Sequence, residues 1–280
     1  VVKQASDIIS TDYSNAFDLN KAIEQLLDRK WDDPMDSWSA EEKIFIARFS
    51  GAGGLDEFAI KAGVKLDRGS LYEYYTPDMV IEKMWGLAYK YGYREGPICE
   101  PSVGIGTFFN RKYVKDYVQK TGYETNKYSA KICRILYPES NINEGKEKMN
   151  FEQVFLKNNY TIKGNVPAKF DLVIGNPPYG GKEAFNSIYL AMGEKGYTNA
   201  HSWPEYFIFR GLDILKPQGL LIYIIGVEAA AGGTPWLEQP TNKAKEAIQA
   251  KADLIDAYRL PEGVFERTGV VSDIIVFRKK

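Results

Sequence analysis

One short segment combines residue types that could bind a planar amine. An apolar run over residues 171–175 stops at the sequence Asn-Pro-Pro-Tyr, residues 176–179. The two prolines remove two backbone donors and fix φ, so this turn is rigid and cannot extend a sheet. It displays an amide side chain, a fixed carbonyl and an aromatic face. We expect the Asn176 amide oxygen and the Pro177 carbonyl to accept both protons of an –NH2 group, while Tyr179 stacks on its ring.

A second segment is a turn that contains glycines. It runs Glu-Pro-Ser-Val-Gly-Ile-Gly over residues 100–106, directly after an apolar segment. Glycines at such a turn let the backbone approach a ligand that a Cβ would exclude. The sequence departs from the dinucleotide-binding fingerprint, because Phe109 occupies the third glycine position. Taken alone, Gly104 and Gly106 are equally consistent with a plain structural turn.

The third candidate is Glu124, which ends a short apolar segment about twenty residues beyond the glycine turn. In doubly wound folds, an acid at this place accepts hydrogen bonds from both hydroxyls of a ribose. By itself, Glu124 is better explained as a solvated surface residue, since Glu is mostly exposed. Together with the glycine turn, it indicates a nucleoside-bearing cofactor.

The elements that must position these residues alternate between strands and helices. Residues 1–60 have helical spacing, with a capping box at Ser39-Ala40-Glu41-Glu42, and Thr76-Pro77 is predicted to supply an N-cap and a first-turn proline to another helix. Strands are predicted near 97–100, 121–124, 142, 171–175, 219–226, 253–258 and 272–278, and helices over 106–119, 127–136, 203–215 and 241–250. This alternation predicts a doubly wound α/β sheet with a ligand at the carboxyl ends of its strands.

Composition excludes several other classes of protein. The 280 residues are 44% hydrophobic and 26% charged, which is typical of a soluble globule with one large α/β domain and an N-terminal annex. The longest apolar run, Leu220–Ile225, is far shorter than the ~20 residues of a membrane span. Cys99 and Cys133 cannot form a disulfide framework and suit a reducing cytoplasm, and the single His201 excludes a multi-histidine metal site. The net charge of −1 gives no global sign of nucleic-acid binding.

The glycine turn, the ribose acid and Asn-Pro-Pro-Tyr occur in the order found in S-adenosylmethionine-dependent adenine-N6 DNA methyltransferases, which the chain therefore resembles. The resemblance implies a Rossmann-like, doubly wound mixed sheet of the class I methyltransferase fold, DNA as partner and no metal. It implies three groups of site residues. The catalytic group is Asn176, Pro177, Pro178 and Tyr179; the cofactor group is Thr76, Glu100, Pro101, Gly104, Gly106, Glu124, Asn150, Phe151 and Asn176; and the group for the substrate base is Tyr179, Phe207 and Phe265.

A narrower resemblance extends to the segment before the sheet. Glu41-Glu42-Lys43, Gly51-Ala52-Gly53-Gly54 and Tyr75-Thr76-Pro77 are similar to the methylase domain of large phage and mobile-element proteins that also carry a helicase-like region. This similarity implies a bacterial or phage-encoded cytoplasmic protein that acts in restriction-modification or anti-restriction. It also implies further domains of a longer polypeptide, for target recognition or helicase-like work. We predict a helical region over 1–70 and a methyltransferase domain over 71–280.

Two alternatives stay open from the sequence. Asn-Pro-Pro-Tyr also serves the methylation of protein glutamine and of amino groups in RNA, because both substrates present a planar amide or amine to the same acceptors. The chain could instead be a module that binds cofactor or DNA without turnover in the absence of its other domains. The Thr-Pro segment and the Phe265 region favour adenine in nucleic acid.

Overall fold

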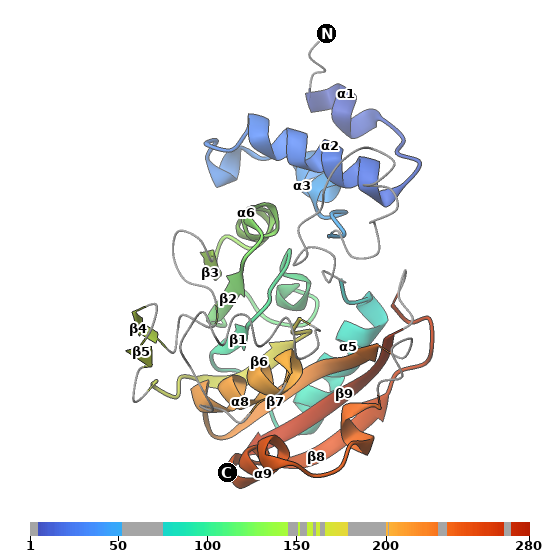
Figure 1. The fold of residues 1–280 in the computed structure, drawn as a ribbon. Helices are drawn as coiled ribbons and strands as arrows, with labels where there is room; N and C mark the ends of the chain where they lie inside the picture. The colour runs from blue at the N-terminus through green and yellow to red at the C-terminus, as the bar shows by residue number, and fades with distance from the viewer. Residues whose placement is uncertain are drawn as a thin grey trace.

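The fold is described from a computed structural model (Figure 1). The structure describes residues 5–51, 75–144, 151, 156–158, 161–162, 166–178, 200, 202–228, 234–265 and 270–280. The predicted boundary between residues 70 and 71 lies outside these ranges, so the division into two domains stays a prediction. Within the described part of the chain, no helix is both long and apolar enough to cross a membrane.

A seven-stranded mixed sheet forms the centre of the molecule, in the order β3-β2-β1-β6-β7-β9-β8 (Figure 1). Its strands are β1 (Ile98–Glu100), β2 (Lys120–Glu124), β3 (Asn141–Glu144), β6 (Phe170–Gly175), β7 (Leu215–Glu228), β8 (Ala252–Arg259) and β9 (Val270–Lys279). The first five in this spatial order are parallel, whereas β9 pairs antiparallel with both β7 and β8. The predicted mixed, doubly wound sheet is confirmed.

The sheet separates two apolar clusters, because successive side chains of a strand point to opposite faces. On one face, Ile98, Leu172 and Ile274 pack with α5 (Asp78–Lys90). On the other face, Cys99, Val173 and Ile275 pack with α8 (Trp203–Ile214) and α9 (Lys243–Lys251). All six of these strand residues are fully buried. Both faces of the sheet are therefore covered.

The N-terminal helices form a third cluster that lies above α6 (Lys127–Leu136) in Figure 1. They are α1 (Ala5–Ser10), α2 (Ala16–Arg29) and α3 (Ala40–Ile46), with the 3-10 turn η1 (Met35–Ser37) between the last two. The predicted capping box of α3 is confirmed, because Ser39 and Glu42 bond reciprocally to each other's backbone N–H. The predicted helical character of the N-terminus is confirmed over 5–51.

Two predictions about local structure need correction, and one element was not predicted. The predicted helix over 106–119 is only the short 3-10 helix η3 (Thr107–Phe109) followed by turns, because Phe108 and Phe109 are both buried and the Asn110 side chain accepts the Lys112 N–H. Thr76 is not the N-cap of α5. Pro77 occupies that position, extended and without a side-chain cap bond. The sequence also gave no sign of the two-stranded pairing of β4 (Leu156–Asn158) with β5 (Thr161–Ile162).

The remaining predicted elements are confirmed with small shifts at their ends. The helices α6, α8 and α9 begin and end within two residues of their predicted bounds. β7 begins four residues before its predicted start, because the strand continues to pair through a register shift between Phe170 and Leu172 of β6. The short 3-10 helix η7 (Trp236–Glu238) precedes α9.

Candidate active site

The Asn-Pro-Pro turn leaves the sheet at the carboxyl end of β6, between its neighbours β1 and β7. Pro177 is buried, while Asn176 and Pro178 are half-buried. Gly175 allows a close approach at this point, because a Cβ there would lie 3.1 Å from Cγ of Glu100. Asn176 thus emerges directly above the end of β1. Tyr179 lies outside the described residues, so its predicted stacking role stays a prediction.

The glycine turn after β1 is held in a conformation that its glycines make possible. Gly104 and Gly106 have φ values of 53° and 85°, in the left-handed region that favours glycine. A Cβ on Gly104 would lie 2.8 Å from the Tyr75 ring, and one on Gly106 would lie 2.6 Å from Sγ of Cys133. These glycines are therefore needed both for backbone conformation and for packing, whatever ligand the turn binds.

Glu124 connects the glycine turn to the end of β2. Its Oε2 accepts the Gly104 N–H at 2.8 Å, and its Oε1 accepts the N–H groups of Thr125 and Asn126 at 2.7 and 2.8 Å. Burial raises the pKa of the Glu124 carboxyl, and these backbone N–H groups oppose that rise. The Glu124 residue as a whole is half-buried. Glu124 thus shapes the glycine turn, a structural role that its position in the sequence did not indicate, and its predicted contact with a ribose stays a prediction.

Glu100 is the most constrained ionisable group at this edge of the sheet. Its side chain is 2% exposed, and none of the described residues gives its Oε2 a hydrogen-bond partner. Burial and the nearby Glu124 carboxyl raise the pKa of Glu100 well above its usual value. A buried oxygen without a partner has a free-energy cost that a bound cationic donor would remove.

Ser102 joins the two turns. Its Oγ donates to the backbone carbonyl of Asn176 at 3.3 Å, across 74 positions of sequence. The sequence analysis placed Ser102 inside the glycine turn but gave it no role. This contact places Asn176, the predicted catalytic residue, against the predicted cofactor turn. The two turns meet because β1 and β6 are adjacent parallel strands whose carboxyl ends lie side by side.

The predicted aromatic residues fall into two places. Phe151 is 1% exposed and stacks on Phe207 of α8 with ring centroids 5.2 Å apart, while Tyr123 meets Phe151 edge-on at 5.6 Å. These three rings belong to the α8 face of the sheet. Phe265 is 5% exposed and packs in the cluster of the α5 face. The structure therefore brings Phe207 into contact with Phe151, which was predicted to bind the cofactor. It does not bring Phe207 to Phe265, with which it was predicted to contact the substrate base.

Of the other predicted cofactor residues, Thr76 and Pro101 are buried. Thr76 immediately precedes the N-cap of α5, next to Tyr75, whose ring covers Gly104. Asn150 lies outside the described residues. Among the residues that the structure describes, no three His, Cys, Asp or Glu side chains gather closely enough to hold a metal ion.

The residues at this edge fit S-adenosylmethionine in chemical type. The partnerless Oε2 of Glu100 is a buried acceptor suited to an ammonium group, and the Glu124 carboxylate has the acceptor oxygens that ribose hydroxyls need. The Phe151 ring, which packs against Phe207 and Tyr123, is aromatic and chemically suited to contact with a purine. Glu100 and Glu124 lie at the carboxyl ends of β1 and β2, and Phe151 packs on the α8 face of the sheet.

Comparison with solved structures defines the class of the fold. The chain superposes on a putative class I S-adenosylmethionine-dependent methyltransferase from Listeria monocytogenes with a TM-score of 0.53 and 17% identity, over 94% of this chain and 78% of that one. It also superposes on the methyltransferase subunit of a type I restriction-modification system from Streptococcus thermophilus, with a TM-score of 0.54 and 16% identity, over 99% of this chain and 62% of that one. The fold is that of class I methyltransferases.

The family follows from sequence comparison. Residues 41–233 match the family described as Eco57I restriction-modification methylase, and the chain belongs to that family. It is 29% identical over 241 residues to Defense against restriction protein B of Escherichia phage P1, covering 85% of this chain and 9% of that protein. It is 32% identical over 110 residues to the Type II restriction enzyme and methyltransferase RM.Eco57I of Escherichia coli, covering 37% and 11%.

These matches confirm the predicted resemblance to restriction-modification methylases and to a large phage protein. The chain spans about a tenth of the length of the curated relatives that it matches.

Proposed function

We propose that the chain transfers a methyl group from S-adenosylmethionine to the N6 amine of adenine in DNA. The observation that carries this proposal is the contact between the Ser102 hydroxyl and the Asn176 carbonyl, which joins the glycine turn to the Asn-Pro-Pro turn. A methyl donor bound at the first turn and an amine bound at the second would meet at one point. Methyl transfer needs this proximity, because positioning supplies much of its rate.

The residues that would hold the cofactor are those of the turns after β1 and β2. Glu124 would accept the ribose hydroxyls, Glu100 would face the ammonium group, and Phe151 would contact the adenine ring. When bound, S-adenosylmethionine supplies an electrophilic methyl group on a sulfonium. The ammonium group of the cofactor would then be a cationic partner for ionised Glu100.

The Asn-Pro-Pro turn would activate the amine. The lone pair of an exocyclic amine is delocalised into its ring, which makes the amine a poor nucleophile. The Asn176 Oδ1 and the Pro177 carbonyl would each accept one N–H, and two such hydrogen bonds favour a localised lone pair. After transfer, the amine proton leaves to solvent or toward Asn176. The two prolines keep both acceptors in place, so little reorganisation is required during the reaction.

Covalent catalysis has no role in this proposal. Cys99 and Cys133 are both buried, and burial raises the pKa of each thiol well above its usual value. Neutral, inaccessible thiols are poor nucleophiles. Direct attack of the amine on the methyl group needs neither of them.

DNA as the substrate is supported by the family of restriction-modification methylases and by the similarity to a Type II restriction enzyme and methyltransferase. The N6 amine lies inside a duplex, so the adenine would have to be flipped out, at a cost of a few kcal/mol. We assign contact with the flipped base to Tyr179 and Phe265, while Phe207 supports the Phe151 ring. We further propose that the chain acts within a longer phage or bacterial cytoplasmic protein, beside target-recognition or helicase-like domains, with 71–280 as its methyltransferase domain.

The test is transfer of a labelled methyl group from S-adenosylmethionine to unmethylated genomic DNA, total RNA and protein, assayed separately. We expect label in DNA, and none in DNA with Asn176→Ala. Label in RNA or in protein glutamine alone would contradict the proposal and identify one of the alternatives. Cofactor binding measured by calorimetry, without transfer to any of the three polymers by the chain or its full-length parent, would identify a non-catalytic module.

A further inference from the structure

The middle residue of the glycine turn does not pack into the core of the sheet. Ile105 is 5% exposed, and its side chain belongs to the apolar cluster of the N-terminal helices. That cluster includes Leu26 of α2 and Ile46 of α3, together with Ile132 and Ile135 of α6. The turn that we assign to the cofactor is therefore anchored on its far side by helices that precede the sheet in sequence.

Tyr75 provides a second link between the same elements. Its ring covers Gly104 so closely that a Cβ there would lie 2.8 Å away, and its hydroxyl lies 2.8 Å from Oγ of Ser129 in α6. The Tyr75 ring also meets that of Phe49, just beyond α3, with centroids 6.3 Å apart. The glycine turn thus touches a side chain that bridges α6 and the N-terminal helices.

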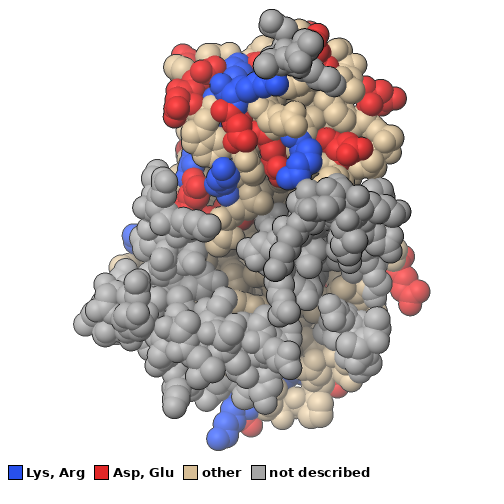
Figure 2. Space-filling model, turned by 45° about the horizontal axis from the view of Figure 1, so that its top comes forward, with Lys and Arg blue, Asp and Glu red and all other residues tan. Residues whose placement is uncertain are grey.

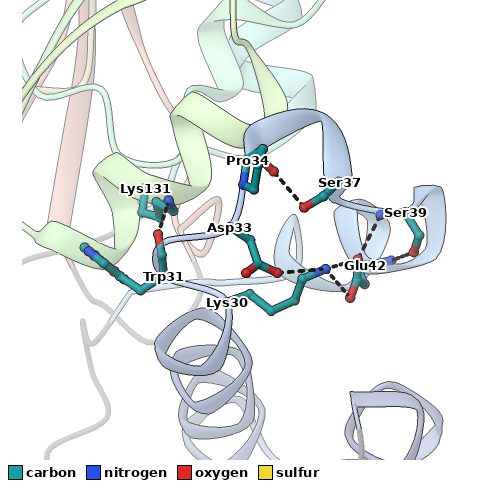
Figure 3. Close-up of polar contacts among 8 residues, drawn as sticks. All are labelled: Lys30, Trp31, Asp33, Pro34, Ser37, Ser39, Glu42 and Lys131. Atoms are coloured by element: carbon teal, nitrogen blue, oxygen red, sulfur yellow. Dashed lines mark hydrogen bonds and ion pairs between the residues drawn. The ribbon is translucent and has the colours of Figure 1, made fainter.

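Polar contacts join the N-terminal helical region to α6. The Nζ of Lys131 in α6 donates to the Trp31 carbonyl at 2.5 Å (Figure 3). The Tyr128 hydroxyl donates to Asp28 of α2 at 3.1 Å. Burial lowers the pKa of Lys131, which is the cost of placing that ammonium between the elements. These contacts hold α2 against α6, the helix whose first residues follow Glu124.

A further network joins α2 to α3. Lys30 at the end of α2 donates to both oxygens of Glu42, at 2.8 and 2.9 Å, and Glu42 closes the capping box with Ser39 (Figure 3). Burial alone would raise the pKa of Glu42, but the hydrogen bonds from Lys30 and Ser39 lower it. Two helices joined in this way would move as one body.

The exposed face of the N-terminal helices gives no evidence of a separate phosphate-binding role. In the upper part of Figure 2, Lys and Arg side chains alternate with Asp and Glu side chains and form no patch of one sign. A surface that grips a nucleic-acid backbone carries clustered positive charge. The inner side of these helices, in contrast, carries the apolar and polar contacts described above.

We propose that the N-terminal helices α1–α3 position the cofactor turn, with Ile105 as the positioning residue that connects them. A turn with two left-handed glycines has many conformations open to it, and burial of Ile105 selects one of them. The inference rests on the proposed cofactor site. Because coupling between two sites is reciprocal, cofactor binding must in turn stabilise the docked state of the N-terminal helices.

The test compares two alanine variants of one apolar cluster by calorimetric titration with S-adenosylmethionine. Ile105→Ala should weaken binding roughly 5- to 50-fold, the usual range for a coupled site. The control, Ile135→Ala, removes an equally buried isoleucine of α6 and should lower the melting temperature comparably while binding changes less than about threefold. Ile105→Val should restore most of the affinity. Equal affinity of Ile105→Ala and Ile135→Ala, both folded, would overturn the inference and leave the proposed function intact.

A second measurement applies if Ile105→Ala fails to fold. Hydrogen exchange of the wild-type chain, with and without S-adenosylhomocysteine, should show slower exchange of α2 amides when this ligand binds. Saturated binding with unchanged exchange throughout α2 would overturn the coupling. Wild-type protein that binds neither ligand would instead contradict the proposed function, and the inference would fail with it.

Discussion

The turns at the carboxyl ends of the central strands form two groups, a cofactor half and an amine half, and each holds its side chains in a different way. On the cofactor half, defined by residues 100–106 and 124–126, the polar groups bond mainly to one another, with Glu124 accepting three backbone N–H groups. On the amine half, defined by residues 176–178, stiffness comes from two consecutive prolines. The cofactor half therefore depends on a hydrogen-bond network and the amine half on a rigid backbone. Substitutions in the two halves should have separable effects.

The largest effect is expected on the amine half. Asn176→Ala removes the side-chain acceptor and should lower the rate of methyl transfer by about 10³-fold or more, as loss of a preorganised polar contact does. Cofactor affinity, measured by calorimetry, should stay within about threefold, since the cofactor half is intact. Asn141→Ala, an exposed asparagine of β3, serves as the control and should retain activity. A fall in affinity as large as the fall in rate would remove the distinction between the halves.

The converse result is expected for Glu124. Glu124→Ala leaves three backbone N–H groups without their acceptor, and should weaken cofactor binding by about 1–3 kcal/mol. Glu124→Gln keeps one acceptor oxygen and should fall between the alanine variant and the wild type. Calorimetry with S-adenosylmethionine measures both. Unchanged affinity in the alanine variant would refute the assignment to ribose.

Glu100 should show opposite effects on stability and on binding. Since its pKa is raised in the folded chain, the folded state holds a proton that the unfolded state loses once the pH passes about 4.5, so stability falls as the pH rises above that value. Glu100→Gln cannot ionise and should be more stable than the wild type at pH 8 by on the order of 1 kcal/mol, but not at pH 4. Its cofactor affinity should be lower.

Chemical denaturation at the two pH values measures the stability difference for Glu100. The same dependence on pH in variant and wild type would show that this carboxyl does not carry the raised pKa. Unaltered cofactor affinity would show that Glu100 faces no ligand.

The smallest effect is expected away from both halves, where α5 meets β8. Burial alone would raise the pKa of Asp256, but hydrogen bonds from Tyr91, Tyr258 and Lys90 lower it from 3.8 to about 2. This group therefore adds stability above about pH 4 that is lost as the pH falls toward 2. Asp256→Asn should cost less than about 1 kcal/mol at pH 7, with wild-type methyl transfer. Thermal melts from pH 7 to pH 2 test this, and a variant with the wild-type acid sensitivity would contradict it.

The sequence predicted the sheet and the order of its turns, because apolar strand runs and proline or glycine punctuation are local signals. It did not predict that residues 107–109 form only a short 3-10 helix, in which Phe108 and Phe109 are both buried in one apolar cluster. The N-terminal helix predictions succeeded where caps were local, as at Ser39 and Glu42.

The candidate site was predictable only in part. The types of its residues could be recognised, but its internal contacts depend on distant segments: Ser102 meets Asn176 across 74 positions, and Phe207 meets Phe151 and not Phe265. The anchoring of Ile105 among the N-terminal helices has the same origin. No pattern along the chain encodes such contacts.

The central proposal is that the Asn176 turn holds the exocyclic amine of adenine in DNA while S-adenosylmethionine donates the methyl group to it. The most direct measurement is chromatography and mass spectrometry of nucleosides from DNA methylated with isotopically labelled S-adenosylmethionine. The account predicts label in N6-methyladenine, and its absence with Asn176→Ala. Label in methylated cytosine would contradict adenine as the substrate, and label at a ring nitrogen of adenine would contradict the assignment of the amine to Asn176 and Pro177.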